Sequence, residues 1–314
     1  MFLQVLTKVS VLFVLLFVGA IAKYSGILND EFNKSLAKLV LVITLPVLYF
    51  YSLATQFTLE LFRLIWLLPV FAICFVAVAY LIAVFLSRLV KLNKAERATF
   101  IYLSTFTNCG FLAIPIANML YGEAGVMRVV FFNVGFNILY WTLGVWTLRN
   151  SNPTLPPEKS AIKASLKNLI NSGTIGLLCG IIVGAAAIKL PSFVLDASNM
   201  LGAATIPMAL LVVGSIMGGR GNLKELHSYR GAIFLIALCK LIIIPIFALF
   251  ITGFFGFLDP LTRAIVVLQA AMPSASTTPI FTTRFGGDSR LASIGVFATT
   301  IISVITVPIV MSLV

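Results

Sequence analysis

Two apolar segments of this 314-residue chain are interrupted by proline, glycine and small polar residues at matching places. Pro115 precedes Gly122 by seven positions, and Pro279 precedes Gly286 by the same distance. A helix that breaks inside hydrocarbon leaves N–H and C=O groups unpaired, so such a break persists only where protein, water or a ligand satisfies them. Paired breaks in two halves of a membrane protein are the best sequence indication of a transporter's substrate site.

Composition places the chain in the membrane. Sixty per cent of its residues are hydrophobic, 10% are charged and its mean hydropathy is +1.09, which excludes an ordinary soluble domain. We therefore expect an all-α polytopic membrane protein with the lipid bilayer as its solvent, since a spanning helix needs roughly 20 apolar residues. Ten apolar runs are long enough, at about 5–23, 36–55, 62–87, 97–120, 125–148, 169–189, 194–217, 230–254, 262–285 and 290–313.

The two halves of the chain resemble each other at three anchors. Val18-Gly19-Ala20 matches Val183-Gly184-Ala185, Thr44-Leu45-Pro46 matches Thr205-Ile206-Pro207, and Pro115 matches Pro279, at offsets of 165, 161 and 164 positions. Five helices per repeat is an odd number, so the second repeat must be inverted relative to the first, as in many secondary transporters. We predict one repeat at 1–149, a cytoplasmic linker at 150–167 and a second repeat at 168–314, with crossing broken helices in spans 4 and 9.

The net charge of +12 reflects topology rather than nucleic-acid binding, because the basic residues lie in short loops between apolar runs. With both termini outside, sixteen of the twenty-two lysines and arginines lie on the inner side. The positive-inside rule therefore predicts that orientation in the cytoplasmic (inner) membrane. The inner residues are Lys23, Lys34, Lys38, Arg88, Lys91, Lys94, Arg97, Arg149, Lys159, Lys163, Lys167, Arg220, Lys224, Arg230, Arg284 and Arg290.

The breaks supply most of the candidate substrate-binding residues. N-terminal ends of half-helices present free N–H groups that suit an anion, and C-terminal ends present carbonyls that suit a cation. Hydroxyl groups can donate to a carboxylate or cap exposed backbone. The alternative is a pair of simple kinks whose hydroxyls bond to their own helix. The candidates are Asn108, Gly110 and Pro115 in the first break and Pro273, Ser274, Ser276, Thr277 and Pro279 in the second.

Three further polar residues lie inside apolar runs. Asn133 and Asn137 are four positions apart and so share one helix face, where they bind either the ligand and the broken backbone or simply a neighbouring helix. Lys240 is the only charge well inside a span, which makes it a functional candidate, with snorkelling to the interface as the alternative. It could pair with an anion, exchange a proton or lie where a cation would otherwise bind.

Several chemistries lack support in the sequence. None of the ten acidic residues lies in the middle of a span, so a carboxylate proton relay or a carboxylate sodium site is not predicted. The chain has no HExxH, P-loop or GxSxG pattern, and its four cysteines form no CxxC pair. We therefore expect no enzyme activity, no cofactor and no metal site.

The residues around both breaks resemble the auxin efflux carrier family. The resemblance is carried by Thr107-Asn108-Cys109-Gly110-Phe111 with Pro115 and by Ala271-Met272-Pro273-Ser274 with Gly286, Asp288 and Ser293. It implies a compact, bacterial-type member within the superfamily of bile acid–sodium symporters, with crossing helices, a scaffold-plus-transport arrangement, efflux of an organic anion and scope for a homodimer. Members of the family often have an asparagine after the second proline. Here Ser274, Ser276 and Thr277 follow instead, so the substrate can differ.

Together these features predict a secondary transporter that exports a small organic anion, auxin-like or a dicarboxylate, by alternating access. Spans 1, 2, 6 and 7 would form a scaffold, spans 3–5 and 8–10 would carry the site, and Pro46 and Pro207 would be hinges between them. A sodium-coupled importer of organic anions is the alternative in the same class. A membrane sensor or scaffold without transport is the alternative from a different class.

Overall fold

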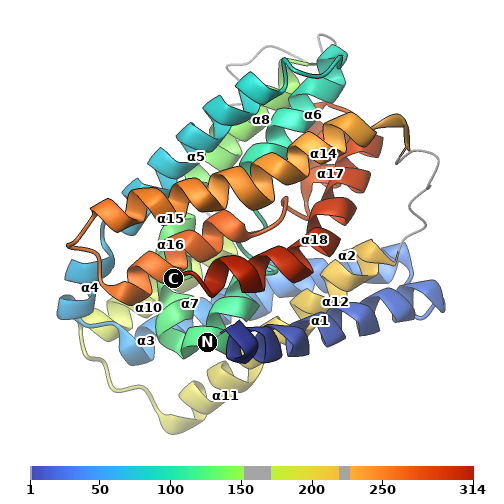
Figure 1. The fold of residues 1–314 in the computed structure, drawn as a ribbon. Coiled ribbons are helices and arrows are strands. Elements are labelled where there is room, and N and C mark those ends of the chain that lie inside the picture. Colours follow the sequence, from blue (N-terminus) through green and yellow to red (C-terminus); the bar gives the residue numbers. More distant parts are fainter. Residues whose placement is uncertain (1, 152–170, 219–226) are drawn as a thin grey trace.

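The computed structural model describes residues 2–151, 171–218 and 227–314, and these residues are almost entirely helical (Figure 1). Within this part of the chain, six helices are long and apolar enough to cross a membrane. An all-helical membrane protein is therefore confirmed, while ten spans in two inverted repeats stay a prediction. The six candidate spans are Asp30–Gln56, Leu59–Leu86, Ala113–Arg149, Ser192–Met217, Arg230–Phe254 and Ser289–Met311, with shorter apolar helices at Ser10–Tyr24, Ser172–Ala185 and Pro260–Ala271.

Helices follow one another with short connections up to residue 151. In order they are α1 (Phe2–Tyr24), α2 (Asp30–Leu39), the π-helical turn η1 (Val40–Thr44), α3 (Leu45–Gln56), α4 (Leu59–Ile65), α5 (Leu68–Leu86), α6 (Lys94–Thr105), α7 (Ala113–Leu139), the π-helical turn η2 (Tyr140–Gly144) and α8 (Val145–Arg149). The predicted spans 97–120 and 125–148 meet at Gly122, where α7 has non-helical backbone angles (φ 63°, ψ −155°) and consists of two helices joined at a kink.

The rest of the described chain continues in the same way. Its elements are α10 (Ser172–Ala185), α11 (Ser192–Ala203), α12 (Thr205–Met217), α14 (Arg230–Leu238), the π-helical turn η3 (Cys239–Ile243), α15 (Ile244–Phe254), α16 (Pro260–Ala271), α17 (Thr278–Phe285) and α18 (Ser289–Met311). Most of the predicted linker at 150–167 lies outside the described residues.

Polar residues in the connections explain where several helices begin. Asn93 caps α6 by accepting a hydrogen bond from the Glu96 N–H, and the Glu96 carboxylate accepts one from the Asn93 N–H, which is a complete capping box. Asp259 and Asp288 cap α16 and α18 by accepting from N–H groups three positions on. Each cap satisfies N–H groups that no helical carbonyl can reach.

Two of the π-helical turns precede a proline. Pro46 follows η1 at the second position of α3, and Pro245 follows η3 at the second position of α15. A proline lacks an N–H and clashes with the carbonyl four residues earlier, so a locally wider turn relieves the clash without ending the helix. The turn η3 contains Lys240, and its widening therefore sets the position of the one charge buried in that span.

Helix packing divides into two sets. In the first set, α1 packs against α12, and α3 packs against α10 and α11. In the second set, α5 and α16 pack against α7, α15 against α16, and α17 against α18. Close approach of backbones requires glycine in the first set, since a Cβ on Gly176 would lie 2.2 Å from the Pro46 carbonyl oxygen and one on Gly214 would lie 2.0 Å from that of Leu16.

Candidate functional site

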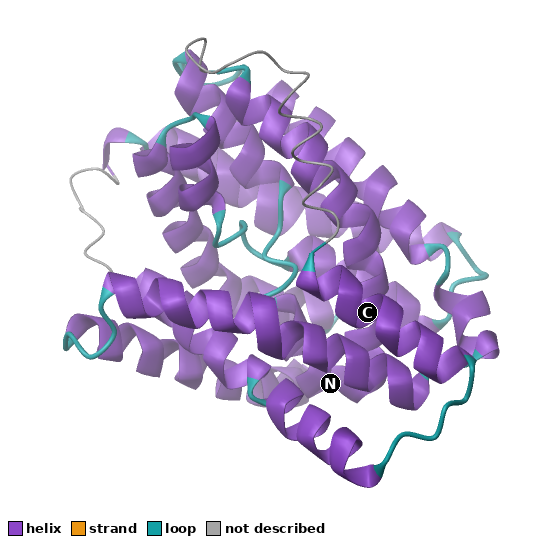
Figure 2. Ribbon diagram, turned by 180° about the vertical axis from the view of Figure 1, so that it is seen from behind, coloured by secondary structure: helices purple, strands orange, loops and turns teal. Residues whose placement is uncertain are grey.

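The two broken helices meet inside the protein, where their connecting loops cross within the helical body (Figure 2). The first break separates α6 from α7, and the second separates α16 from α17. Thr107 and Ser274 form an antiparallel bridge. The Asn108 N–H donates to the Pro273 carbonyl at 2.8 Å, and the Ala275 N–H donates to the Phe106 carbonyl at 3.0 Å. Each break thereby satisfies backbone groups of the other, as buried irregular backbone requires. We call this meeting point the crossover.

Each interruption ends in the same backbone conformation. Gly122 and Gly286 both have positive φ, at 63° and 101°. L-residues rarely adopt this region, and glycine does so without strain. Gly122 and Gly286 therefore have equivalent roles. Each lets the chain turn sharply after the second half of a broken helix.

The first break contains two buried polar residues whose side chains are only partly satisfied. Asn108 is 3% exposed and its Nδ2 has no hydrogen-bond partner, and the Thr107 hydroxyl is buried and unpaired as well. A Cβ on Gly110 would meet nothing within 4 Å, so this part of the break is not tightly packed. Pro115 lies in the first turn of α7, where its missing N–H costs no helical hydrogen bond.

The second break is held more firmly. The fully buried Ser274 hydroxyl donates to the Leu103 carbonyl at 2.8 Å, and its N–H donates to the Thr299 hydroxyl at 3.3 Å. Thr277 and Tyr140 share a hydrogen bond of 2.6 Å between their hydroxyls. Ser276 is 5% exposed, and Pro279 lies in the first turn of α17.

The two predicted asparagines of α7 differ in their surroundings. Asn133 is buried and joins the crossover, since its Nδ2 donates to the Cys109 carbonyl at 3.2 Å. Its Oδ1 accepts from the Gln269 side chain at 3.0 Å. The structure thus gives Asn133 a role in holding broken backbone. Asn137 is half-buried and takes no part in this network of described residues.

Gln269 was missed by the sequence reasoning. It lies in α16 just before the second break, it is fully buried, and its Oε1 has no hydrogen-bond partner. A signal was present, because it is the sole glutamine in the interior of any predicted span. Its amide links α16 to α7, and α7 is in turn linked to the first break through Asn133.

Lys240 reaches the crossover from η3. Its side chain is completely buried, and its Nζ donates to the Thr105 carbonyl at 3.3 Å. Thr105 is the last residue of α6, so the ammonium group lies at the C-terminal end of a half-helix. The two ion pairs among the described residues are Lys23–Asp30 and Arg128–Asp259, and neither involves Lys240.

Some of the buried polar atoms that lack a hydrogen-bond partner lie at the crossover. Buried polar groups are nearly always hydrogen-bonded, so a cluster of exceptions needs an explanation such as a ligand or ordered water. Within the described chain, the buried side-chain atoms next to the breaks that lack a partner belong to Thr105, Thr107, Asn108 and Gln269. All four residues lie at the end of α6, in the first break or in α16.

The predicted hinge residues lie away from the crossover. Pro46 is buried in the first turn of α3 and faces Gly176 of α10. Pro207 lies in the first turn of α12. Both prolines belong to the first packing set, and a hinge role for them stays a prediction.

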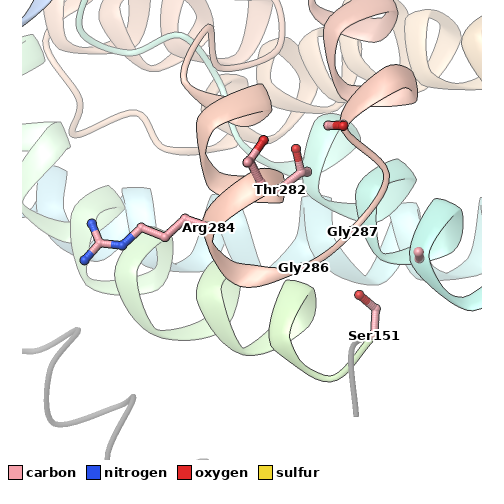
Figure 3. A pocket seen from close by; sticks show the side chains of 8 residues that line it. Ser151, Thr282, Arg284, Gly286 and Gly287 are labelled. Carbon is pink, nitrogen blue, oxygen red and sulfur yellow. The ribbon is translucent and has the colours of Figure 1, made fainter. Parts of the chain in front are cut away.

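An open pocket lies at the C-terminal end of α17, apart from the predicted site residues (Figure 3). Its volume is about 320 Å³. The Arg284 side chain points away from Ser151, and its guanidinium lies 5.1 Å from the centre of the Phe285 ring. The pocket is lined by Ala95, Ser151, Thr282, Thr283, Arg284, Gly286, Gly287 and Ser289.

Two broken helices that pair at a buried polar site inside a helical membrane protein are the architecture of a membrane transporter. The family model described as membrane transport protein matches residues 4–311. The chain belongs to that family, in agreement with its resemblance to the auxin efflux carriers.

Two relatives are similar over nearly their whole length. An uncharacterized transporter of Methanocaldococcus jannaschii is 25% identical over 304 residues, which cover 95% of each chain. An uncharacterized transporter of Methanothermobacter thermautotrophicus is 25% identical over 315 residues, covering 96% of this chain and 95% of the relative.

Proposed function

We propose that this membrane transporter exports a small organic anion and that the crossover is its substrate site. The observation that carries the proposal is the cluster of buried, unpaired polar atoms at the crossover together with the buried ammonium of Lys240. A carboxylate would accept hydrogen bonds from the Asn108 amide and from hydroxyls such as those of Thr105 and Thr107. Thr105, Thr107 and Asn108 lie within four consecutive positions at the junction of α6 and the first break, and in this proposal one anionic group accepts from several of them.

The positive charge contributed by Lys240 and by two half-helix ends favours an anionic substrate over a cationic one. Lys240 brings a positive charge to the crossover, and no carboxylate of the described residues pairs with it. A second positive contribution comes from the half-helices that begin at Ala113 and Thr278, whose N-terminal ends carry partial positive charge. An anion that enters this region lowers the cost of burying the lysine, whereas a free cation raises it.

The proposed mechanism is alternating access between two helix bundles. The first packing set, α1, α2–α3, α10 and α11–α12, would be the scaffold, and the second set would carry the crossover. The support is that the strongest packing falls within each set and that α7 and α18 of the second set touch α1 of the first. In this proposal, Pro46 and Pro207 allow the scaffold helices to bend.

The proposal also includes a membrane topology. We infer ten spans in two inverted repeats, in the cytoplasmic membrane with both termini outside, and the family resemblance leaves room for a homodimer. The matched positive-φ glycines and the antiparallel pairing of the breaks support the repeat. With a negative interior, moving one negative charge outward is favoured by roughly 2.3 kcal/mol per 100 mV. Export would therefore need no coupling ion.

Transport by purified protein tests the proposal. A thermal-shift screen of auxin-like acids and dicarboxylates identifies ligands, because a ligand that binds the folded state raises the unfolding midpoint. Positive compounds are then followed as radiolabelled substrates in proteoliposomes, with and without sodium. We expect sodium-independent flux that increases when the membrane potential favours anion movement. Strictly sodium-dependent uptake would indicate the importer, and folded protein without flux of any ligand would indicate a sensor or scaffold.

A further inference from the structure

The C-terminal end of α6 is closed by side chains from other parts of the chain. A helix end leaves its last carbonyls without helical partners and carries about half a negative charge. Here the Leu103 carbonyl accepts from the Ser274 hydroxyl at 2.8 Å, and the Thr105 carbonyl accepts from Lys240 Nζ at 3.3 Å. One of these two donors is the side-chain amino group of a lysine, so the negative end of α6 faces a group that is positively charged when protonated.

The matching end of α16 is closed differently. The backbone pairing itself is equivalent at the two ends, because the Phe106 carbonyl accepts from the Ala275 N–H at 3.0 Å and the Pro273 carbonyl accepts from the Asn108 N–H at 2.8 Å. The ends differ in the lysine, since among the described residues no charged side chain donates to a carbonyl in the last turn of α16. Lys240 is specific to the α6 end, and the widened turn η3 places its side chain there.

The complete burial of Lys240 limits which groups can hold its side chain. Lys240 is 0% exposed, and a charge so deeply buried needs a partner. Its Nζ donates to a backbone carbonyl, and neither of the two ion pairs among the described residues includes it. The ammonium is thus held by the same kind of oxygen that holds a bound ion in a transporter, namely carbonyls of unwound backbone and of half-helix C-terminal ends.

We propose that the Lys240 ammonium group is a built-in cation that occupies the place of a sodium ion at the C-terminal end of α6. Sodium and an ammonium group carry the same charge and both bind carbonyl oxygens, so the lysine satisfies this end permanently. The consequence for transport rests on the proposed function: the carrier moves its anion without sodium because its cation is covalently attached. The cation site itself does not depend on the identity of the substrate.

Chemical rescue tests the proposal without a substrate. Thermal unfolding of purified wild type, Lys240→Ala, Lys240→Met and Lys91→Ala is measured in sodium chloride and in choline chloride at equal concentration. Lys240→Ala removes the charge and leaves space, so its midpoint should be below that of wild type in choline and rise by about 2 °C or more in sodium. Lys240→Met fills the space with an apolar chain and should show no such rise.

Wild type and Lys91→Ala are the controls and should be insensitive to the exchange of choline for sodium, since Lys91 is an exposed residue of the loop between α5 and α6. A wild type that sodium stabilises, or a folded Lys240→Ala with equal midpoints in both salts, would overturn the proposal. If Lys240→Ala does not fold in either salt, wild-type transport decides, because sodium-dependent flux contradicts a built-in cation and sodium-independent flux supports it. Rescue by sodium without flux of any anion would leave the cation site standing and refute the proposed function alone.

Discussion

Asn108 and Asn133 are buried to nearly the same degree, but their side-chain amides differ in their hydrogen-bond partners. Asn108 is 3% exposed with an unpaired Nδ2, whereas Asn133 is 4% exposed and both donates to Cys109 and accepts from Gln269. One amide is therefore available to a ligand, and the other holds protein to protein. The same substitution at the two positions should have opposite consequences.

We expect Asn108→Ala to weaken substrate binding about 10- to 100-fold, the value of one or two hydrogen bonds, with little change in the unfolding midpoint. Asn133→Ala should destabilise the fold by roughly 2–4 kcal/mol, because it leaves a buried carbonyl and a buried amide without partners. Titration of a ligand by thermal shift measures both quantities in one experiment. Equal losses of stability in the two variants would contradict the assignment of Asn108 to the ligand.

Arg128 illustrates a buried charge with a structural role. It is 5% exposed, and its guanidinium donates to the Thr262 hydroxyl at 3.0 Å, the Ala124 carbonyl at 3.2 Å and the Asp259 carboxylate at 3.2 Å. These contacts tie α7 to the start of α16. Arg128→Ala should cost about 3 kcal/mol of stability, the lower end of the range for a buried pair that loses one partner, because the Asp259 side chain is 23% exposed.

Arg128→Lys keeps the charge of Arg128 but cannot form the three-way contact, so it should recover less than half of that stability. Denaturant or thermal unfolding of the two variants measures the difference. Full recovery by lysine would show that charge alone, and not the guanidinium fork, joins the two helices.

At the level of whole elements, close helix packing depends on missing side chains. Gly176 of α10 lies against the α3 backbone, so a Cβ there would be 2.2 Å from the Pro46 carbonyl. Gly176→Ala should therefore force α10 away from α3 and cost about 1–3 kcal/mol. Gly231→Ala is the matched control, because its Cβ would meet only a Val90 methyl at 3.9 Å. If the two variants unfold at the same temperature, α3 and α10 do not pack as described.

The broken elements could be predicted from sequence, while their partners could not. Proline and glycine spacing indicated both breaks, and burial of a lone charge or amide indicated Lys240 and Asn133 as candidates. The contacts they make join residues far apart in the chain: Lys240 with Thr105, and Gln269 with Asn133, are separated by 135 and 136 positions. No local pattern encodes which carbonyl a distant side chain reaches, and the same limit explains why Gln269 was missed.

In the whole molecule, the proposed mechanism requires the two helix sets to move relative to each other. Gln56 at the end of α3 and Glu123 beside the kink in α7 are joined by a hydrogen bond between their side chains. This bond links the proposed scaffold to the proposed transport bundle. If the bundles slide past each other during transport, the bond must break and re-form in each cycle, so a covalent link at the same place should arrest transport.

A short thiol-reactive cross-linker tests this in a variant whose native cysteines have been replaced and whose transport is retained. Cross-linking the Gln56→Cys and Glu123→Cys pair should reduce anion flux at least about 10-fold, and a reducible linker should restore it on cleavage. The control is Lys23→Cys with Asp30→Cys, an ion-paired couple on α1 and α2 that lies within the first packing set. Because that pair moves as one body, cross-linking it should leave flux unchanged. Undiminished flux through a fully cross-linked 56–123 pair would mean that transport does not require the two sets to separate there.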